Sequence, residues 1–219
     1  MQHLMPPALL ALEDGTIWPG FGFGHLGETT GEAVFNTSMT GYQEVITDPS
    51  YHGQIVTMTA PQIGNVGTNP DDDESARAWV AGFVVRELSP LTSNYRSHLP
   101  LDDYLRERNV VGITGVSTRA LVKHIRTFGA QRAALSSVDT QAQRLIEMAR
   151  NSRDMNGLDL AREVTCEEPY HWTEAANAEW YVKDGRQATN DIQHRSGVDH
   201  VSSSPHIVAF DFGIKRNIL

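Results

Sequence analysis

The first 85 residues carry short runs of alternating apolar and polar positions, which are typical of β-strands. Asp14-Gly15 separates two such runs, and this dipeptide is a strong signal for a two-residue hairpin turn. The pattern therefore predicts that the first half of the chain is rich in sheet. The expected strands cover residues 8–12, 16–18, 32–36, 55–59 and 78–85.

After residue 100 the apolar positions recur three and four residues apart, which is the spacing of amphipathic helices. The expected helices cover residues 101–108, 118–128 and 141–150. A buried strand is expected at residues 110–113 and another strand at residues 131–135. In the second helix Leu121, Ile125 and Phe128 share one face, Ser117 is placed to cap the start and Gly129 is placed to end it. The first 155 residues are thus predicted to form one mixed α/β domain.

The apolar periodicity fades after this domain, and Ser, Asn, Gln, His and charged residues become frequent. Residues 156–205 are therefore predicted to be a linker. The following residues, 206–219, read HIVAFDFGIKRNIL and begin with an apolar run that is typical of a strand buried in a parallel sheet. We expect this run to be the first strand and turn of a further domain.

The composition narrows the classes of partner. The chain has 219 residues and a formal net charge of −9, with the basic residues scattered, so neither nucleic acid nor an anionic membrane surface is an expected partner. No apolar run is long enough to cross a bilayer, and the first 15 residues lack the features of a secretory signal. A single cysteine fits a reducing compartment, and we expect a cytoplasmic location.

Three motifs suggest chemistry but fit simpler interpretations. The run at residues 22–27, GFGHLG, has dinucleotide-fingerprint spacing, but strand-like sequence follows it and a glycine-rich turn is favoured. The acidic run at residues 71–74 lacks the spacing of a calcium loop and is interpreted as a solvated turn. Cys166 precedes Glu167 and Glu168, whose charges disfavour a thiolate, so it is interpreted as non-catalytic. No metal site is predicted.

The run at residues 36–58, NTSMTGYQEVITDPSYHGQIVTM, is rich in hydroxyl, amide and glycine positions flanked by apolar residues. Within it Asp48-Pro49-Ser50 forms a turn signal, because proline fixes φ and the aspartate can accept a hydrogen bond from its own backbone. The turn would present the Ser50 hydroxyl at a defined place. From the residues alone, a ligand-binding loop and a simple connection without a ligand both remain open.

This run resembles the small subunit of glutamine-dependent carbamoyl phosphate synthetase. Four further segments resemble the same family in the same order: ALEDGTIWPGFGFG, ITGVSTRALVKHIRTFGA, NGLDLAREVT and VAFDFGIKRNIL. The resemblance covers nearly the whole chain and is weakest at residues 180–205. It implies a swivelling β/β/α N-terminal domain at residues 1–155, a linker, and the first strand of a class I glutaminase domain at residues 206–219.

In this family the small subunit releases ammonia from glutamine, and a large subunit with ATP and Mg²⁺ uses it to make carbamoyl phosphate for pyrimidine and arginine synthesis. The resemblance implies that Ser50 contacts glutamine, whereas the catalytic cysteine, histidine and glutamate are expected beyond Leu219. Residues 1–219 are therefore expected to be inactive alone and to join a hetero-oligomer with the large subunit. A non-catalytic docking module with no role in glutamine binding is the alternative.

Overall fold

The computed structural model describes residues 5–173 and 207–219. The chain divides into a main unit, residues 1–165 with 212–219, and a second unit, residues 166–211. The helices, 3-10 turns (η) and strands are β1 (Pro7–Leu12), β2 (Ile17–Gly24), β3 (Glu28–Asn36), α1 (Tyr42–Thr47), η1 (Pro49–Tyr51), β4 (Gln54–Met58), β5 (Gln62–Ile63), η2 (Pro70–Asp72), β6 (Gly82–Val84), β7 (Glu87–Leu88), α2 (Leu101–Glu107), β8 (Val111–Thr114), α3 (Thr118–Phe128), β9 (Gln131–Ser136), α4 (Ala142–Asn151), α5 (Leu160–Val164) and η4 (Arg216–Ile218).

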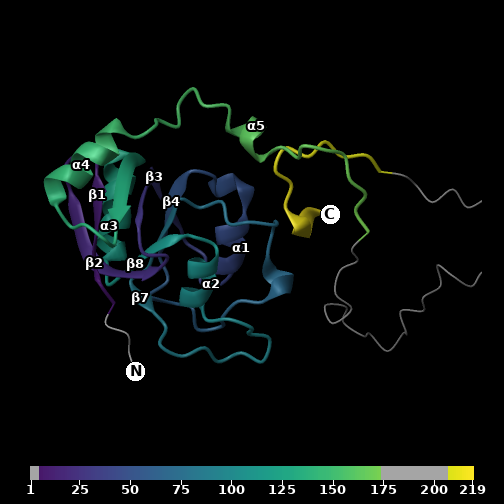
Figure 1. The fold of residues 1–219 in the computed structure, drawn as a ribbon, viewed down its shortest axis with the longest axis horizontal. Helices are drawn as coiled ribbons and strands as arrows, with labels where there is room; N and C mark the ends of the chain where they lie inside the picture. The colour runs from purple at the N-terminus through teal and green to yellow at the C-terminus, as the bar shows by residue number, and fades with distance from the viewer. Residues whose placement is uncertain (1–4, 174–206) are drawn as a thin grey trace, which may run out of the picture. The chain divides into compact units, whose positions relative to one another are not determined.

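Seven strands of the main unit close into a barrel in the order β1-β2-β8-β6-β4-β3-β9, and β9 pairs back with β1. The β3–β4, β4–β6 and β6–β8 pairs are parallel, and the other pairs are antiparallel. Parallel neighbours need a crossover connection. Helix α1 connects β3 to β4, and α2 lies in the connection from β6 to β8 (Figure 1).

The β1–β2 hairpin follows from its turn residues. Gly15 has φ of +98°, a conformation that favours glycine, and its N–H donates to the carbonyl of Leu12 at 3.0 Å. The Asp14 carboxylate accepts from both the N–H and the hydroxyl of Thr16, each at 2.8 Å. The predicted hairpin turn is confirmed.

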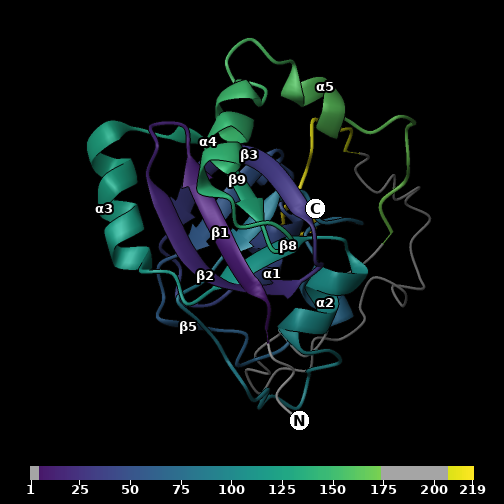
Figure 2. The same cartoon turned by 60° about the vertical axis from the view of Figure 1, so that its left-hand side comes forward.

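Alternate residues of the strands fill the barrel, since successive side chains on a strand point to opposite faces. Leu10, Leu12 and Leu135 are fully buried and belong to one cluster with Leu121 and Ile125 of α3. On the other face of β1 and β9, a second cluster joins these strands to α4. Figure 2 shows α4 lying across β1 and β9, with α3 beside the barrel.

Three expectations differ from the structure in detail. Phe128 is 68% exposed and its ring lies 4.7 Å from that of His124, because the core beneath α3 ends at Ile125, one turn earlier. Ser117 occupies the N-cap position of α3 but makes no side-chain capping hydrogen bond. Residues 207–212 are not in a strand, and Ile207 is 85% exposed.

Two further expectations concern segments outside the main helices. Residues 22–24 end β2 and a turn leads directly into β3, so the interpretation of a glycine-rich turn rather than a nucleotide loop is confirmed. Residues 174–205 of the predicted linker, and residue 206, lie outside the described residues. Within residues 5–173 and 207–219, no helix combines the length and apolar character needed to cross a membrane.

Candidate functional site at the Asp48-Pro49-Ser50 turn

Helix α1 fixes the position of the turn against the core. Tyr42 and Ile46 are buried on the inner face of this helix, in one cluster with Met58 of β4. The helix ends at Thr47, and Asp48, which follows it, has the extended backbone (φ −75°, ψ 118°) that a following proline favours. The turn therefore lies between a packed helix and a barrel strand.

The turn has the geometry that its residues predict. The Asp48 carboxylate accepts from the Ser50 N–H at 2.8 Å, and the Asp48 carbonyl accepts from the Tyr51 N–H at 3.0 Å. Asp48 is 7% exposed, whereas Ser50 is exposed, and the Ser50 hydroxyl makes no hydrogen bond with the part of the chain that the structure describes. Ser50 thus presents a donor and an acceptor from a fixed backbone.

Thr47 anchors the helix end to a neighbouring loop. Its side chain is fully buried, and its hydroxyl donates to the carbonyl of Gln43 at 2.9 Å and accepts from the N–H of Glu74 at 2.8 Å. The Gln43 side chain in turn donates to the carboxylate of Asp73 at 2.6 Å. These bonds tie α1 to the acidic run at residues 71–74.

The interpretation of the acidic run as a solvated turn holds for Asp71, which is exposed, and is wrong for Asp72, Asp73 and Glu74, which are half-buried or buried. Asp73 accepts from the hydroxyl of Tyr104 at 2.5 Å and pairs with Arg108, while Asp72 pairs with Arg96 at 3.2 Å. Glu74 is only 8% exposed. The fold brings α2 and the loop at residue 96 against these carboxylates, and buried or half-buried charges are stable only when they are paired in this way.

The C-terminal segment of the main unit, residues 212–219, contacts the turn. Lys215 Nζ lies 2.9 Å from the second carboxylate oxygen of Asp48, and this hydrogen bond raises the pKa of Lys215. Glu74 accepts from the backbone N–H and the side-chain amide of Asn217, at 3.1 and 2.8 Å. The Asp48 carboxylate therefore bridges the Ser50 backbone and Lys215.

A glycine allows this contact. Gly213 has φ of +92°, and a Cβ at this position would lie 3.0 Å from the Cβ of Pro49 and 2.8 Å from a methyl group of Val164. A larger residue would therefore separate the C-terminal segment from the turn, in addition to adopting a strained backbone.

His52, two residues after Ser50, is held by other groups. Its Nε2 lies 2.8 Å from the Glu163 carboxylate, whose pKa this hydrogen bond lowers, and its ring packs edge-on against Trp79 with centroids 5.1 Å apart. Among the described residues, no hydrogen bond joins His52 to Ser50. A serine nucleophile needs an adjacent base, so the turn is suited to binding rather than to nucleophilic attack.

The other candidates from the sequence offer no competing site. Cys166 is exposed and is a free thiol. Within residues 5–173 and 207–219, no three His, Cys, Asp or Glu side chains gather as they would around a metal ion. In the described residues, the barrel thus presents a polar turn with an exposed serine and without a nucleophile–base pair at that turn.

Comparisons with known proteins identify the family. Residues 10–135 match the family model described as carbamoyl-phosphate synthase small chain, CPSase domain. The chain is 53% identical to the carbamoyl phosphate synthase small chain of Syntrophotalea carbinolica over 97% of its own length and 53% of that relative, and 46% identical to the chloroplastic small chain of Oryza sativa subsp. japonica over 97% and 44%. It belongs to the carbamoyl phosphate synthase small chain family, and it spans about half the length of these curated relatives.

Proposed function

We propose that this chain is the N-terminal part of the small subunit of a glutamine-hydrolysing carbamoyl phosphate synthetase in the cytoplasm. The subunit releases ammonia from glutamine, and a large subunit combines it with bicarbonate, using ATP and Mg²⁺. The product, carbamoyl phosphate, serves pyrimidine and arginine synthesis. Family membership over nearly the whole chain supports this proposal.

Ser50 is proposed to donate a hydrogen bond to the bound glutamine. The observation that carries this role is the Asp48 carboxylate, which bonds the Ser50 N–H with one oxygen and Lys215 with the other. Lys215 lies in VAFDFGIKRNIL, the segment that resembles the beginning of the glutaminase domain. The turn is thereby tied to the segment proposed to lead into the domain that holds the substrate.

The nucleophile is proposed to lie outside these 219 residues. A cysteine that attacks the glutamine amide forms a thioester and releases ammonia, and water then hydrolyses the thioester, so one difficult step becomes two easier ones. Ser50 has no base partner among the described residues, and Cys166 does not match the position of the family nucleophile. Residues 1–219 alone are therefore proposed to leave glutamine intact.

Transfer of an isotopic label tests this function. The intact gene product would be mixed with the large subunit, bicarbonate, MgATP and glutamine labelled with ¹⁵N in its amide. We expect ¹⁵N in carbamoyl phosphate, detected by mass spectrometry, and no ammonia release by residues 1–219 alone. Unlabelled product would contradict the amidotransferase role, and ammonia release by residues 1–219 would contradict the placement of the nucleophile.

A further inference from the structure

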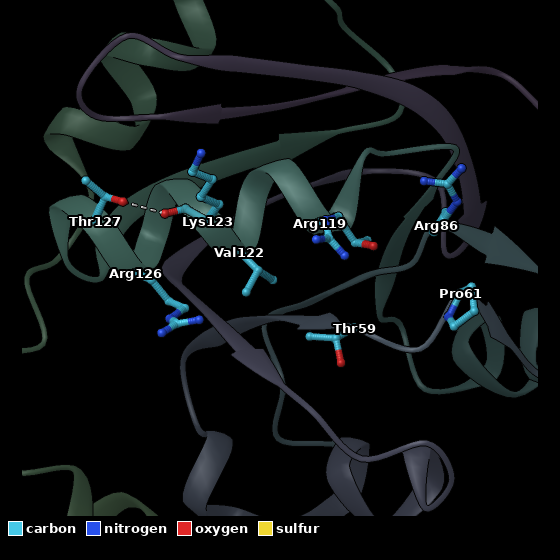
Figure 3. Close-up of a pocket in the computed structure, with 9 residues that line it drawn as sticks. Thr59, Pro61, Arg86, Arg119, Val122, Lys123, Arg126 and Thr127 are labelled. Atoms are coloured by element: carbon cyan, nitrogen blue, oxygen red, sulfur yellow. Dashed lines mark hydrogen bonds between the residues drawn. The ribbon is translucent and has the colours of Figure 1, made fainter.

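A cleft with a volume of about 820 Å³ lies between α3 and the segments that follow β4 and β6 (Figure 3). Four basic side chains line it: Arg86, Arg119, Lys123 and Arg126. All four residues are exposed. Figure 3 shows the three from α3 spaced along the helix, with Arg86 beyond its N-terminal end and Thr59 on the opposite wall.

The sequence of α3 concentrates positive charge on one face. Arg119, Lys123 and Arg126 are four and three residues apart, so they are neighbours on the helix surface, while Leu121 and Ile125 are buried in the barrel. Helix α3 contains no acidic residue. Like charges at these spacings destabilise an isolated helix, so this face gains stability when an anionic group lies against it.

The four basic side chains form no ion pair or side-chain hydrogen bond with residues 5–173 or 207–219. Several other basic residues of the main unit are paired with carboxylates. Arg106 lies 2.6 Å from Asp102, and Arg132 lies 2.6 Å from Glu13. The chain has 27 acidic and 18 basic residues, so acidic side chains are abundant enough to pair with basic ones. The four basic side chains of the cleft are nevertheless unpaired in the described structure.

The nearest acidic group in sequence does not neutralise the cleft. Glu87 follows Arg86 directly and lines an adjoining hollow with Ser117. Its carboxylate accepts a hydrogen bond from the Gln62 side chain at 3.2 Å and is not paired with Arg86 in the described structure. The positive charge of the cleft is therefore available to a partner.

We propose that this cleft is the docking surface for an acidic segment of the large subunit, an inference that rests on the proposed function. Arg119 and Arg126 are seven residues apart, which places them about 10 Å apart along the helix axis. Val122 and Pro61 add apolar surface between the charges. Charges spread over such a length, with apolar surface between them, suit several carboxylates on one peptide segment better than a single small anion, and arginine binds carboxylates with two parallel hydrogen bonds.

A charge-reversal variant of the intact gene product tests this surface. The triple variant Arg119→Glu, Lys123→Glu, Arg126→Glu would be compared with wild type for binding to the purified large subunit across a range of NaCl concentrations. Charges at an interface rim change the association rate and its salt dependence, so we expect binding about tenfold weaker or more at low salt, with a flatter salt dependence.

Two controls separate docking from folding and from general charge. Arg162→Glu makes the same substitution on α5, at an exposed residue outside the cleft, and should bind like wild type. The milder triple variant Arg119→Gln, Lys123→Gln, Arg126→Gln should show a smaller loss of binding than the charge reversal. Thermal unfolding of each variant identifies any that fail to fold, and the salt dependence of wild-type binding tests the inference without a variant.

Three outcomes would overturn the inference. This docking surface would be excluded if the affinity of wild type for the large subunit did not change with NaCl concentration. It would also be excluded if a folded charge-reversal variant bound as tightly as wild type. Thermal stabilisation of wild type by pyrophosphate that the variant loses, with binding to the large subunit unchanged, would identify a small-anion site instead. Transfer of ¹⁵N from glutamine separates the two proposals, because it persists when only the docking surface is wrong and is absent when the proposed function is wrong.

Discussion

Replacement of Thr47 by valine tests how the turn is held in place. Valine preserves the shape of the buried side chain but removes the hydroxyl that accepts from the Glu74 N–H at 2.8 Å and donates to the Gln43 carbonyl at 2.9 Å. Because Thr47 is fully buried, the Glu74 N–H is left without its acceptor, which costs about 1 to 3 kcal/mol of unfolding free energy. For a chain of this size, a loss of about 2 kcal/mol lowers Tm by about 4 to 8 °C.

Thermal unfolding followed by circular dichroism measures this loss. Thr37→Val is the matched control, because Thr37 is exposed in the loop before α1. We expect the Tm of the control to equal that of wild type and the Tm of Thr47→Val to be several degrees lower. If Thr47→Val stays within about 1 °C of wild type, the Thr47 hydroxyl does not hold the turn as described.

Two further predictions concern the barrel and its first hairpin. Leu12→Ala removes a fully buried side chain and should cost about 2 to 5 kcal/mol in a denaturant titration, whereas Leu91→Ala, at a 76% exposed position, should cost less than about 0.5 kcal/mol. Equal effects would contradict the barrel core. Burial opposes ionisation of Asp14, but hydrogen bonds from Thr16, His124 and Gln131 lower its pKa to about 2, below its ordinary value of 3.8. Its stabilising contribution is therefore full above about pH 4 and lost as the pH falls through 2. Asp14→Asn should lose less stability than wild type over this range in acid titrations, and an equal loss would contradict the assignment.

Local signals in the sequence predict the elements that depend on neighbouring residues. Helix α3 spans Thr118–Phe128 as predicted, because its apolar spacing is regular and Gly129, at φ +90°, ends it. The Asp14-Gly15 turn and the Asp48-Pro49-Ser50 turn are likewise set by side chains within two residues of the backbone that they bond. These features need no knowledge of the rest of the chain.

Features that depend on distant residues are not predictable in this way. Closure of the barrel requires β9 to pair with both β1 and β3, and no local pattern specifies those partners. Helix α1 is too short to show a clear apolar period. Because it contains polar residues and lies within the polar run at residues 36–58, the sequence resembles a loop at this point. Within the acidic run, Asp73 is half-buried and is paired with Tyr104 of α2 and with Arg108, which follows α2.

At the candidate site, too, features set by neighbouring residues are predictable and features set by distant residues are not. Ser50 is recognisable from its turn signal and from the family resemblance, whereas the ion pair between Asp48 and Lys215 joins residues that are far apart in the sequence. His52 and Glu163 also lie far apart in sequence and carry no motif that links them. The hydroxyl at the site could be predicted, but the contacts that orient it could not.

The glutamine KM of the intact gene product with Ser50→Ala tests the central claim most directly. Loss of one hydrogen bond should weaken glutamine binding by about 1 to 2 kcal/mol. In an assay of ammonia release, this loss corresponds to a KM for glutamine that is roughly 5- to 30-fold higher. Ser93→Ala, at an exposed loop serine, should leave KM unchanged. If KM for Ser50→Ala matches wild type, the turn has no role in glutamine binding, and the alternative of a docking module without such a role is favoured.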